Sequence, residues 1–180
     1  SGITGHKLIK AGASAVKIEG CSDYIIDLVK RCTESGIPVM AHLGLTPQSV
    51  NALGGNRVQG KTEAGAQKLI EDALAIQEVG AFAVVLECIP AKLADMITKK
   101  LDIPTIGIGA GAGCDGQILV YQDMLGLFSE YTPKFVKHFA ELGGAMKEAF
   151  QAYDREVKAG SYPAPEHTFK IDDDVLEKLY

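Results

Sequence analysis

A short phrase recurs along this chain: a small residue or glycine, then a brief apolar segment, then a glycine or a turn. Near-continuous apolar segments of this length, bounded by glycine, are typical of strands buried on both faces of a parallel sheet. The phrase therefore predicts a series of short parallel strands. "GQILVYQD" is a weaker copy, and the clear copies are "AGASAVKIEG", "SGIPVMAHLG", "VGAFAVVLECIP" and "LDIPTIGIGAG".

Helical patterns lie between these segments. Residues 22–35 place their apolar side chains on one helical face, with Ser22 suited to the N-cap and Gly36 to the stop. Residues 62–79 form a longer amphipathic pattern, and residues 91–100 form another after Pro90. Strands that alternate with helices predict an α/β fold in which helices cover a parallel sheet.

The C-terminal third has a different pattern. Two helices with apolar stripes are expected over residues 131–160, followed by a polar tail over residues 161–180. The stripes contain Phe135, Phe139 and Leu142 in the first helix, and Met146, Ala149, Phe150 and Tyr153 in the second. We expect these helices to provide outer packing or a subunit contact. We expect residues 1–180 to belong to a single domain.

The charge pattern gives no support for nucleic-acid or membrane binding. The net charge is −5, and lysines and arginines are scattered along the chain. No apolar run reaches the roughly 18 residues of a transmembrane span. The four cysteines are far apart and form no CxxC pair, as is typical of reduced structural thiols. The first residues also lack the apolar segment of a secretion signal, so we expect a cytoplasmic protein.

Polar residues collect where the predicted strands end. Lys17 and Glu19 end the first strand, His42 the second and Glu87 the third, and a glycine-rich loop follows the fourth. Because the carboxyl ends of parallel strands lie together, this arrangement is that of a (β/α)-barrel active site. Glu87 has apolar neighbours on both sides, so its charge has to be paired with a cation or metal, or neutralised by a proton.

Two loops leave more than one interpretation open. The segment 43–61 is long for a strand-to-helix connection, which usually has about 2–6 residues. It is either a lid over the site or a tolerated surface insertion. The segment "GIGAGAG" has glycines suited to phosphate binding, but a strand is expected to follow it where such loops need a helix.

Several longer motifs resemble the ketopantoate hydroxymethyltransferase family. They are "VKIEG", "HLGLTPQS", "VLECIP", "IGIGAG", "DGQILV", "PKFVKHF" and "YPAPEHTF", in order between about Ala11 and Phe169. The resemblance implies a (β/α)₈ TIM barrel of the phosphoenolpyruvate/pyruvate type, of which about five strands are present here. It also implies a divalent metal, usually Mg²⁺, with methylenetetrahydrofolate as the one-carbon donor. A homo-oligomer, decameric in known members, is implied as well.

The resemblance also implies roles for four residues. Glu87 is the expected catalytic acid or base, and Lys17 and His42 are the expected substrate-binding residues. Glu19 is the expected metal-associated carboxylate. In the implied reaction, the 2-oxo acid 3-methyl-2-oxobutanoate loses its C3 proton, and the metal-stabilised enolate attacks the folate-borne methylene to give ketopantoate.

One feature departs from the family pattern. Members carry two further aspartate metal ligands and a serine on earlier strands, and nothing in this sequence corresponds to them. Two alternatives therefore stay open. In the first alternative, the chain is a truncated, non-catalytic barrel fragment that acts only as an oligomerising module. In the second, it is another metal-dependent lyase or aldolase acting on a 2-oxo acid.

Overall fold

The computed structural model describes residues 2–47, 57–127 and 132–179. These residues form two compact units, one of Ser1–Val120 with Pro133–Val136, the other of Tyr121–Thr132 with Lys137–Tyr180. The expectation that both units belong to one domain stays a prediction. No helix in the described part of the chain is long and apolar enough to cross a membrane.

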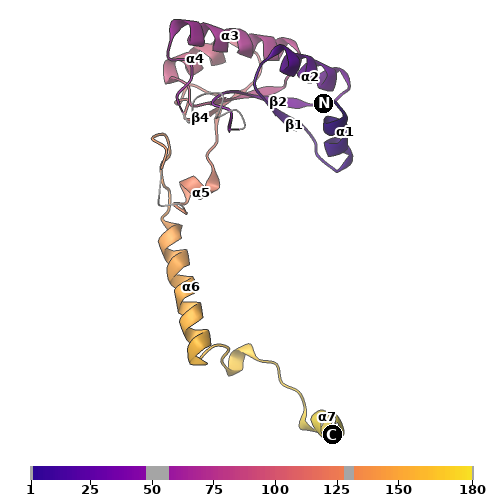
Figure 1. Ribbon diagram of the computed structural model, residues 1–180, viewed down its shortest axis with the longest axis vertical. Coiled ribbons are helices and arrows are strands. Elements are labelled where there is room, and N and C mark those ends of the chain that lie inside the picture. Colours follow the sequence, from indigo (N-terminus) through magenta and orange to yellow (C-terminus); the bar gives the residue numbers. More distant parts are fainter. Residues whose placement is uncertain (1, 48–56, 128–131, 180) are drawn as a thin grey trace. The chain divides into compact units, whose positions relative to one another are not determined.

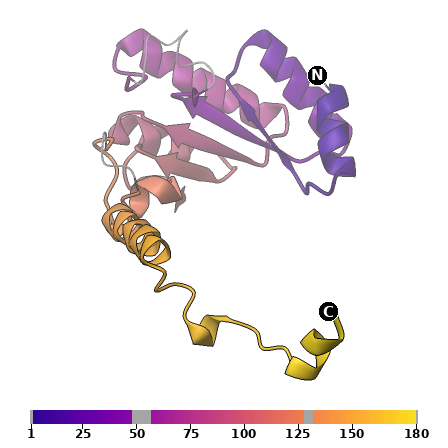
Figure 2. The ribbon, with the colours of Figure 1, turned by 60° about the horizontal axis from the view of Figure 1, so that its bottom comes forward.

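The first unit contains a five-stranded parallel sheet with the strands in sequence order. The strands run side by side in the same direction (Figure 2). Their bounds are β1 Val16–Glu19, β2 Val39–Gly44, β3 Ala83–Glu87, β4 Thr105–Ile108 and β5 Gly116–Gln117. The weak fifth copy of the sequence phrase thus contributes only a two-residue strand.

Four helices accompany this sheet: α1 Gly2–Lys10, α2 Asp23–Glu34, α3 Glu63–Glu78 and α4 Ala91–Lys100. The caps follow the sequence, because the hydroxyls of Ser22 and Thr62 accept backbone N–H bonds at the starts of α2 and α3. Helices α2, α3 and α4 lie on the same face of the sheet (Figure 1).

The sequential strand order explains this one-sided cover. Crossovers between parallel strands are right-handed, so connections that all advance in one direction place their helices on one face. A doubly wound sheet reverses its order and carries helices on both faces. The α/β class and the parallel sheet predicted from the sequence are therefore confirmed. Helices α2, α3 and α4 connect β1 to β4, and β5 follows β4 without a helix between them. The sequential parallel order is that of consecutive strands of a (β/α)₈ barrel.

The hydrophobic core lies between the sheet and its helices. Strand residues alternate between the two faces, and the core takes Val39, Ala41 and Leu43 from β2 and Val84 and Leu86 from β3. These side chains pack with buried helix residues such as Val29, Ile76 and Ile97. The alternate positions on each strand therefore face the other side of the sheet.

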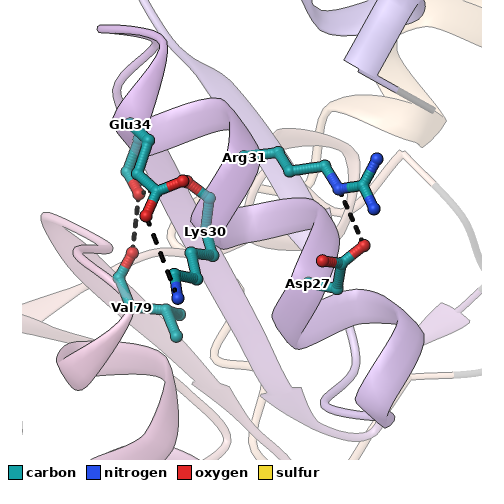
Figure 3. Close-up of polar contacts among 6 residues, drawn as sticks. Asp27, Lys30, Arg31, Glu34 and Val79 are labelled. Atoms are coloured by element: carbon teal, nitrogen blue, oxygen red, sulfur yellow. Dashed lines mark hydrogen bonds and ion pairs between the residues drawn. The ribbon is translucent and has the colours of Figure 1, made fainter.

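The outer surface of α2 is polar and joins the end of α3. Lys30 pairs with Glu34, and Arg31 pairs with Asp27, each one helical turn apart (Figure 3). Thr33 Oγ1 donates to the carbonyl oxygen of Val79 at 2.7 Å, at the C-cap of α3. Each exposed ion pair of this kind stabilises the fold by only ~0.3–0.5 kcal/mol. The hydrophobic core therefore dominates the stability of this unit.

The second unit contains α5 Tyr121–Met124, α6 Leu142–Ala159 and α7 Asp173–Leu176, with short 3₁₀ turns at Pro165–His167 and Glu177–Leu179. Of the two helices expected over residues 131–160, only α6 is present in the described residues. The prediction of a helix through Phe135, Phe139 and Leu142 is wrong. The backbone N–H groups of Phe139 and Leu142 donate to the carbonyls of Met124 and Leu125, so they are not available to a helix of their own.

Candidate active site

The face of the sheet opposite α2–α4 carries the predicted polar residues. In the register of the sheet, Glu19 lies beside His42, and Gly44 lies beside Glu87. His42 itself is paired with Val85, two residues before Glu87 on β3. Residues that are paired across parallel strands share a face, so Glu19, His42 and Glu87 converge there.

His42 is at the centre of this group. Its side chain is only 1% exposed, and its Nε2 atom lies 3.0 Å from Oε2 of Glu87. Its Nδ1 atom lies 3.6 Å from Oε1 of Glu19 on the other side. Neither ring nitrogen has an aligned hydrogen bond among the described residues, so both contacts are close but not yet directional.

The two carboxylates remain open to small molecules. The side chains of Glu19 and Glu87 are 23% and 15% exposed, in contrast to the enclosed ring of His42. Lys17 occupies the same face of β1 as Glu19, two residues earlier, and is exposed. The structure therefore brings Glu19, His42 and Glu87 into contact distance, and places Lys17 on the same face of the same strand as Glu19.

The backbone around Glu87 is tightly constrained. Its carbonyl oxygen accepts the N–H of Leu45 at 2.9 Å, and the next residue, Cys88, has a φ of 51°. A left-handed backbone is uncommon for a residue other than glycine, and such conformations cluster at functional sites. On the neighbouring strand Gly44 has a φ of 91°, and a Cβ atom there would overlap the carbonyl oxygen of Glu87.

Gly44 and Cys88 are site-shaping residues that the sequence reasoning missed. The signal for Gly44 was present in the sequence, because a glycine directly after an apolar strand indicates a close approach by another backbone. Nothing in the sequence marked the positive φ of Cys88. Burial raises the pKa of the Cys88 thiol, and the charge of Glu87 raises it further.

A metal centre is not complete among the described residues. No group of three or more His, Cys, Asp or Glu side chains is placed to hold a metal ion in the described part of the chain. Mg²⁺ requires a near-octahedral shell of oxygen atoms, and Glu19 is the one residue that the sequence reasoning assigned to a metal. The described donor set therefore does not fit Mg²⁺ by itself.

A crevice of about 510 Å³ borders Glu19 and is lined by Cys21, Gln59, Lys68 and Asp72 among others. Lys68 Nζ lies 2.9 Å from Oδ1 of Asp72, which raises the pKa of Lys68. The Cys21 thiol donates to the carbonyl oxygen of Asp72. Burial and the negative charge of Asp72 raise the pKa of Cys21 to about 12, so this thiol is protonated at neutral pH.

A larger crevice of about 870 Å³ follows β3 and β4, and its lining includes Cys88, Gly111, Gln117, Lys134 and Phe135. The glycine-rich segment "GIGAGAG" forms part of this wall. A Cβ atom at Gly111, whose φ is 78°, would overlap the side chain of Ala91 at the start of α4. Close packing against α4 thus accounts for this glycine.

Residues 48–56 of the predicted lid, residues 43–61, lie outside the described residues. Its first and last parts are described, and its last part reaches both crevices. Val58 lines the larger crevice and Gln59 lines the smaller one. The N–H of Gln59 also donates to the carbonyl oxygen of Cys88 at 2.9 Å, which ties this segment to the end of β3.

Comparison with known proteins identifies close relatives. The chain is 63% identical over 179 residues to a 3-methyl-2-oxobutanoate hydroxymethyltransferase of Clostridium novyi, covering 99% of this chain and 65% of that protein. It is 60% identical over 179 residues to the enzyme of the same name from Enterococcus faecalis, with the same coverage of both chains. The chain thus spans 65% of the length of these two relatives.

Among solved structures, a phosphonopyruvate hydrolase aligns with 98% of this chain and 63% of its own chain, at 12% identity and a TM-score of 0.47. The sequence model of the ketopantoate hydroxymethyltransferase family matches residues 3–165. This match contains all five strands and the convergent group Glu19, His42 and Glu87. The chain therefore belongs to the ketopantoate hydroxymethyltransferase family.

Proposed function

We propose that this chain serves in the transfer of a hydroxymethyl group from methylenetetrahydrofolate to 3-methyl-2-oxobutanoate, giving ketopantoate for pantothenate and coenzyme A synthesis. The observation that carries the proposal is the convergence of Glu19, His42 and Glu87 on one sheet face, in a chain of this family. A base beside a fixed polar group is what removal of a weakly acidic proton requires.

Glu87 is the proposed base. It takes the proton from C3 of the 2-oxo acid, and the electrons of the broken C–H bond delocalise into the adjacent carbonyl group. Lys17 is proposed to bind the substrate, where its ammonium group offsets the charge that develops on the oxygen atoms. The carbon nucleophile then forms a bond to the methylene carbon of the folate, whose two C–N bonds break. One released nitrogen takes up the proton that was removed from C3, and the other takes up a proton from water. Water supplies the hydroxyl oxygen of the product.

Glu19 is proposed as one carboxylate of a divalent-metal site, with Mg²⁺ as the expected ion. When bound, such an ion polarises the carbonyl group of a 2-oxo acid. The described residues do not complete its shell, so tight binding needs further oxygen ligands. We expect the chain alone to bind Mg²⁺ weakly, and Glu19→Gln to abolish that binding in a calorimetric titration.

The test of the proposed function is the folate-dependent conversion of 3-methyl-2-oxobutanoate in the presence of Mg²⁺. The chain is assayed alone and together with the segment of the Clostridium novyi enzyme that it does not match. We expect ketopantoate to form, with a higher rate when the added segment supplies further ligands. If neither preparation forms ketopantoate although both bind the 2-oxo acid, the proposed function is refuted.

A second candidate function is a non-catalytic oligomerising module. The observation that favours it is an exposed apolar stripe on α6, formed by Leu142, Met146, Phe150, Tyr153 and Val157. A homo-oligomer is proposed under either function, with a decamer as the family expectation, and a cytoplasmic location is proposed as well. A stable oligomer by light scattering without turnover would favour the module.

The lyase or aldolase alternative gains no support from Cys88. A reactive cysteine, which would support that chemistry, needs a lowered pKa and access to solvent. The Cys88 thiol is buried and its pKa is raised.

A further inference from the structure

We propose that His42 positions the carboxylates of Glu87 and Glu19 and does not itself bind the 2-oxo acid. The inference deepens the proposed function and rests on it, because it assigns a role within the same site. The residue is then a positioning residue, acting on the substrate through Glu87 and Glu19.

The side chain of His42 is far less accessible to solvent than the two carboxylates beside it. The side chain of His42 is 1% exposed, whereas those of Glu19 and Glu87 are 23% and 15% exposed. A small molecule that enters from solvent therefore meets the carboxylates before it meets the imidazole ring. A direct substrate contact would require His42 to leave a site where it is enclosed on nearly every side.

Each ring nitrogen of His42 lies next to a carboxylate oxygen. An imidazole ring has only two polar atoms, Nδ1 and Nε2. Nε2 is 3.0 Å from Glu87, and Nδ1 is 3.6 Å from Glu19. Both nitrogens therefore face a carboxylate oxygen at close range, and a substrate that reached either of them would have to displace a carboxylate.

The backbone supports the same role. The carbonyl oxygen of His42 accepts the N–H of Gly20, which follows Glu19, at 2.9 Å. His42 lies within β2, between β1 and β3, so its ring is held by the middle strand of the three. A group fixed in this way can hold both carboxylates in the rotamers that the reaction needs, and small displacements of a base are costly in rate.

Two substitutions separate the roles of the two nitrogens. The amide of His42→Gln reaches the place of Nε2 and keeps a donor toward Glu87, whereas His42→Asn keeps a polar atom near Nδ1 only. The readout is proton–deuterium exchange at C3 of 3-methyl-2-oxobutanoate, measured by NMR in D2O at several substrate concentrations. His138→Gln is the matched control, because His138 pairs with Glu141 at 2.8 Å in the second unit.

We expect His42→Asn to lower the maximal exchange rate by about 100-fold, the usual cost of a misplaced catalytic group. His42→Gln should restore it to within about tenfold of the unmodified chain. KM for the 2-oxo acid should change less than about threefold in both, because substrate binding does not involve the ring. A tenfold or larger rise in KM with an unchanged maximal rate would show direct substrate binding and overturn the inference.

A second measurement needs no activity. In ¹⁵N-labelled chain, the ring nitrogens of His42 are identified by their loss in His42→Gln. Glu87→Gln should shift the Nε2 signal more than Nδ1, and Glu19→Gln should do the reverse. If neither substitution moves the His42 signals, the inference is wrong. If these shifts appear but no variant, nor the unmodified chain, catalyses exchange, the proposed function fails and the positioning contacts stand.

Discussion

The candidate site could be predicted in part from three residues, Glu87, His42 and Glu19. Their positions at the ends of apolar strands predicted a shared site, and the sheet register brings them together as expected. What the sequence could not predict is which atoms meet. His42 faces a carboxylate on either side because β2 pairs with β1 and with β3. This pairing is set by contacts between segments that are distant in the sequence.

Cys21 provides a pH-dependent prediction. Its pKa is raised from 9.0 to about 12 in the folded chain, mainly by burial and then by Asp72. Between pH 9 and about 12 the unfolded chain loses the thiol proton while the folded chain keeps it, so stability falls as pH rises. Urea unfolding should show a shallower decline for Cys21→Ala than for the unmodified chain over this range. Equal slopes would mean that the thiol is not held protonated.

Gly44 provides a prediction about the backbone beside Glu87. Gly44→Ala places a methyl group against the Glu87 carbonyl at a φ of 91°, so we expect a loss of more than about 2 kcal/mol and slower C3 exchange. Gly36→Ala is the matched control, because φ is 76° there but nothing lies within 4 Å of the added Cβ. It should cost only about 1 kcal/mol and leave exchange unchanged. Equal losses in the two variants would refute the overlap.

At the scale of elements, local patterns predicted most of the structure. The starts of α2 and α3 follow Ser22 and Thr62, whose side chains cap them. The prediction failed for the first C-terminal helix. There the apolar spacing was helical, but the backbone N–H groups of Phe139 and Leu142 donate to the carbonyl oxygens of Met124, the last residue of α5, and Leu125. Tertiary hydrogen bonds of this kind override periodicity and are not visible in a local pattern.

The loop between β4 and β5 is held by one carboxylate. Asp115 Oδ2 accepts the backbone N–H of Thr105 at 2.8 Å, and the N–H of Asp115 donates to Thr105 Oγ1, which is fully buried. We expect Asp115→Ala to destabilise the chain by about 1–3 kcal/mol, because the Thr105 N–H loses its partner. Asp27→Ala, which removes an exposed pair with Arg31, should cost less than about 0.5 kcal/mol. Urea unfolding measures both, and similar losses would contradict the proposed anchor.

At the scale of the whole molecule, the sequential sheet has one covered face and one face that carries the candidate site. The alternation of strands and helices alone also fits a doubly wound sheet, but polar residues at successive strand ends indicated a barrel, so the one-sided cover could be predicted. The assembly of the chain could not be predicted, because the exposed apolar stripe of α6 is equally consistent with outer packing and with a subunit contact.

The α6 stripe is open to a direct test of assembly. Phe150 is 67% exposed at its centre. If the stripe is a subunit contact, Phe150→Lys places a charge in the interface and should shift the oligomer to smaller species in light scattering. Lys158→Gln, near the end of the same helix and paired with Asp154, is the control and should leave the mass unchanged. An unchanged mass in both variants would exclude this contact.

Glu87 is proposed to remove the C3 proton of a 2-oxo acid. Proton–deuterium exchange at C3 of 3-methyl-2-oxobutanoate tests this proposal most directly, because the step needs neither folate nor product release. We predict that the chain accelerates exchange and that Glu87→Gln lowers the rate by at least about 100-fold, while His138→Gln leaves it unchanged. Exchange as fast in Glu87→Gln as in the unmodified chain would contradict the assignment.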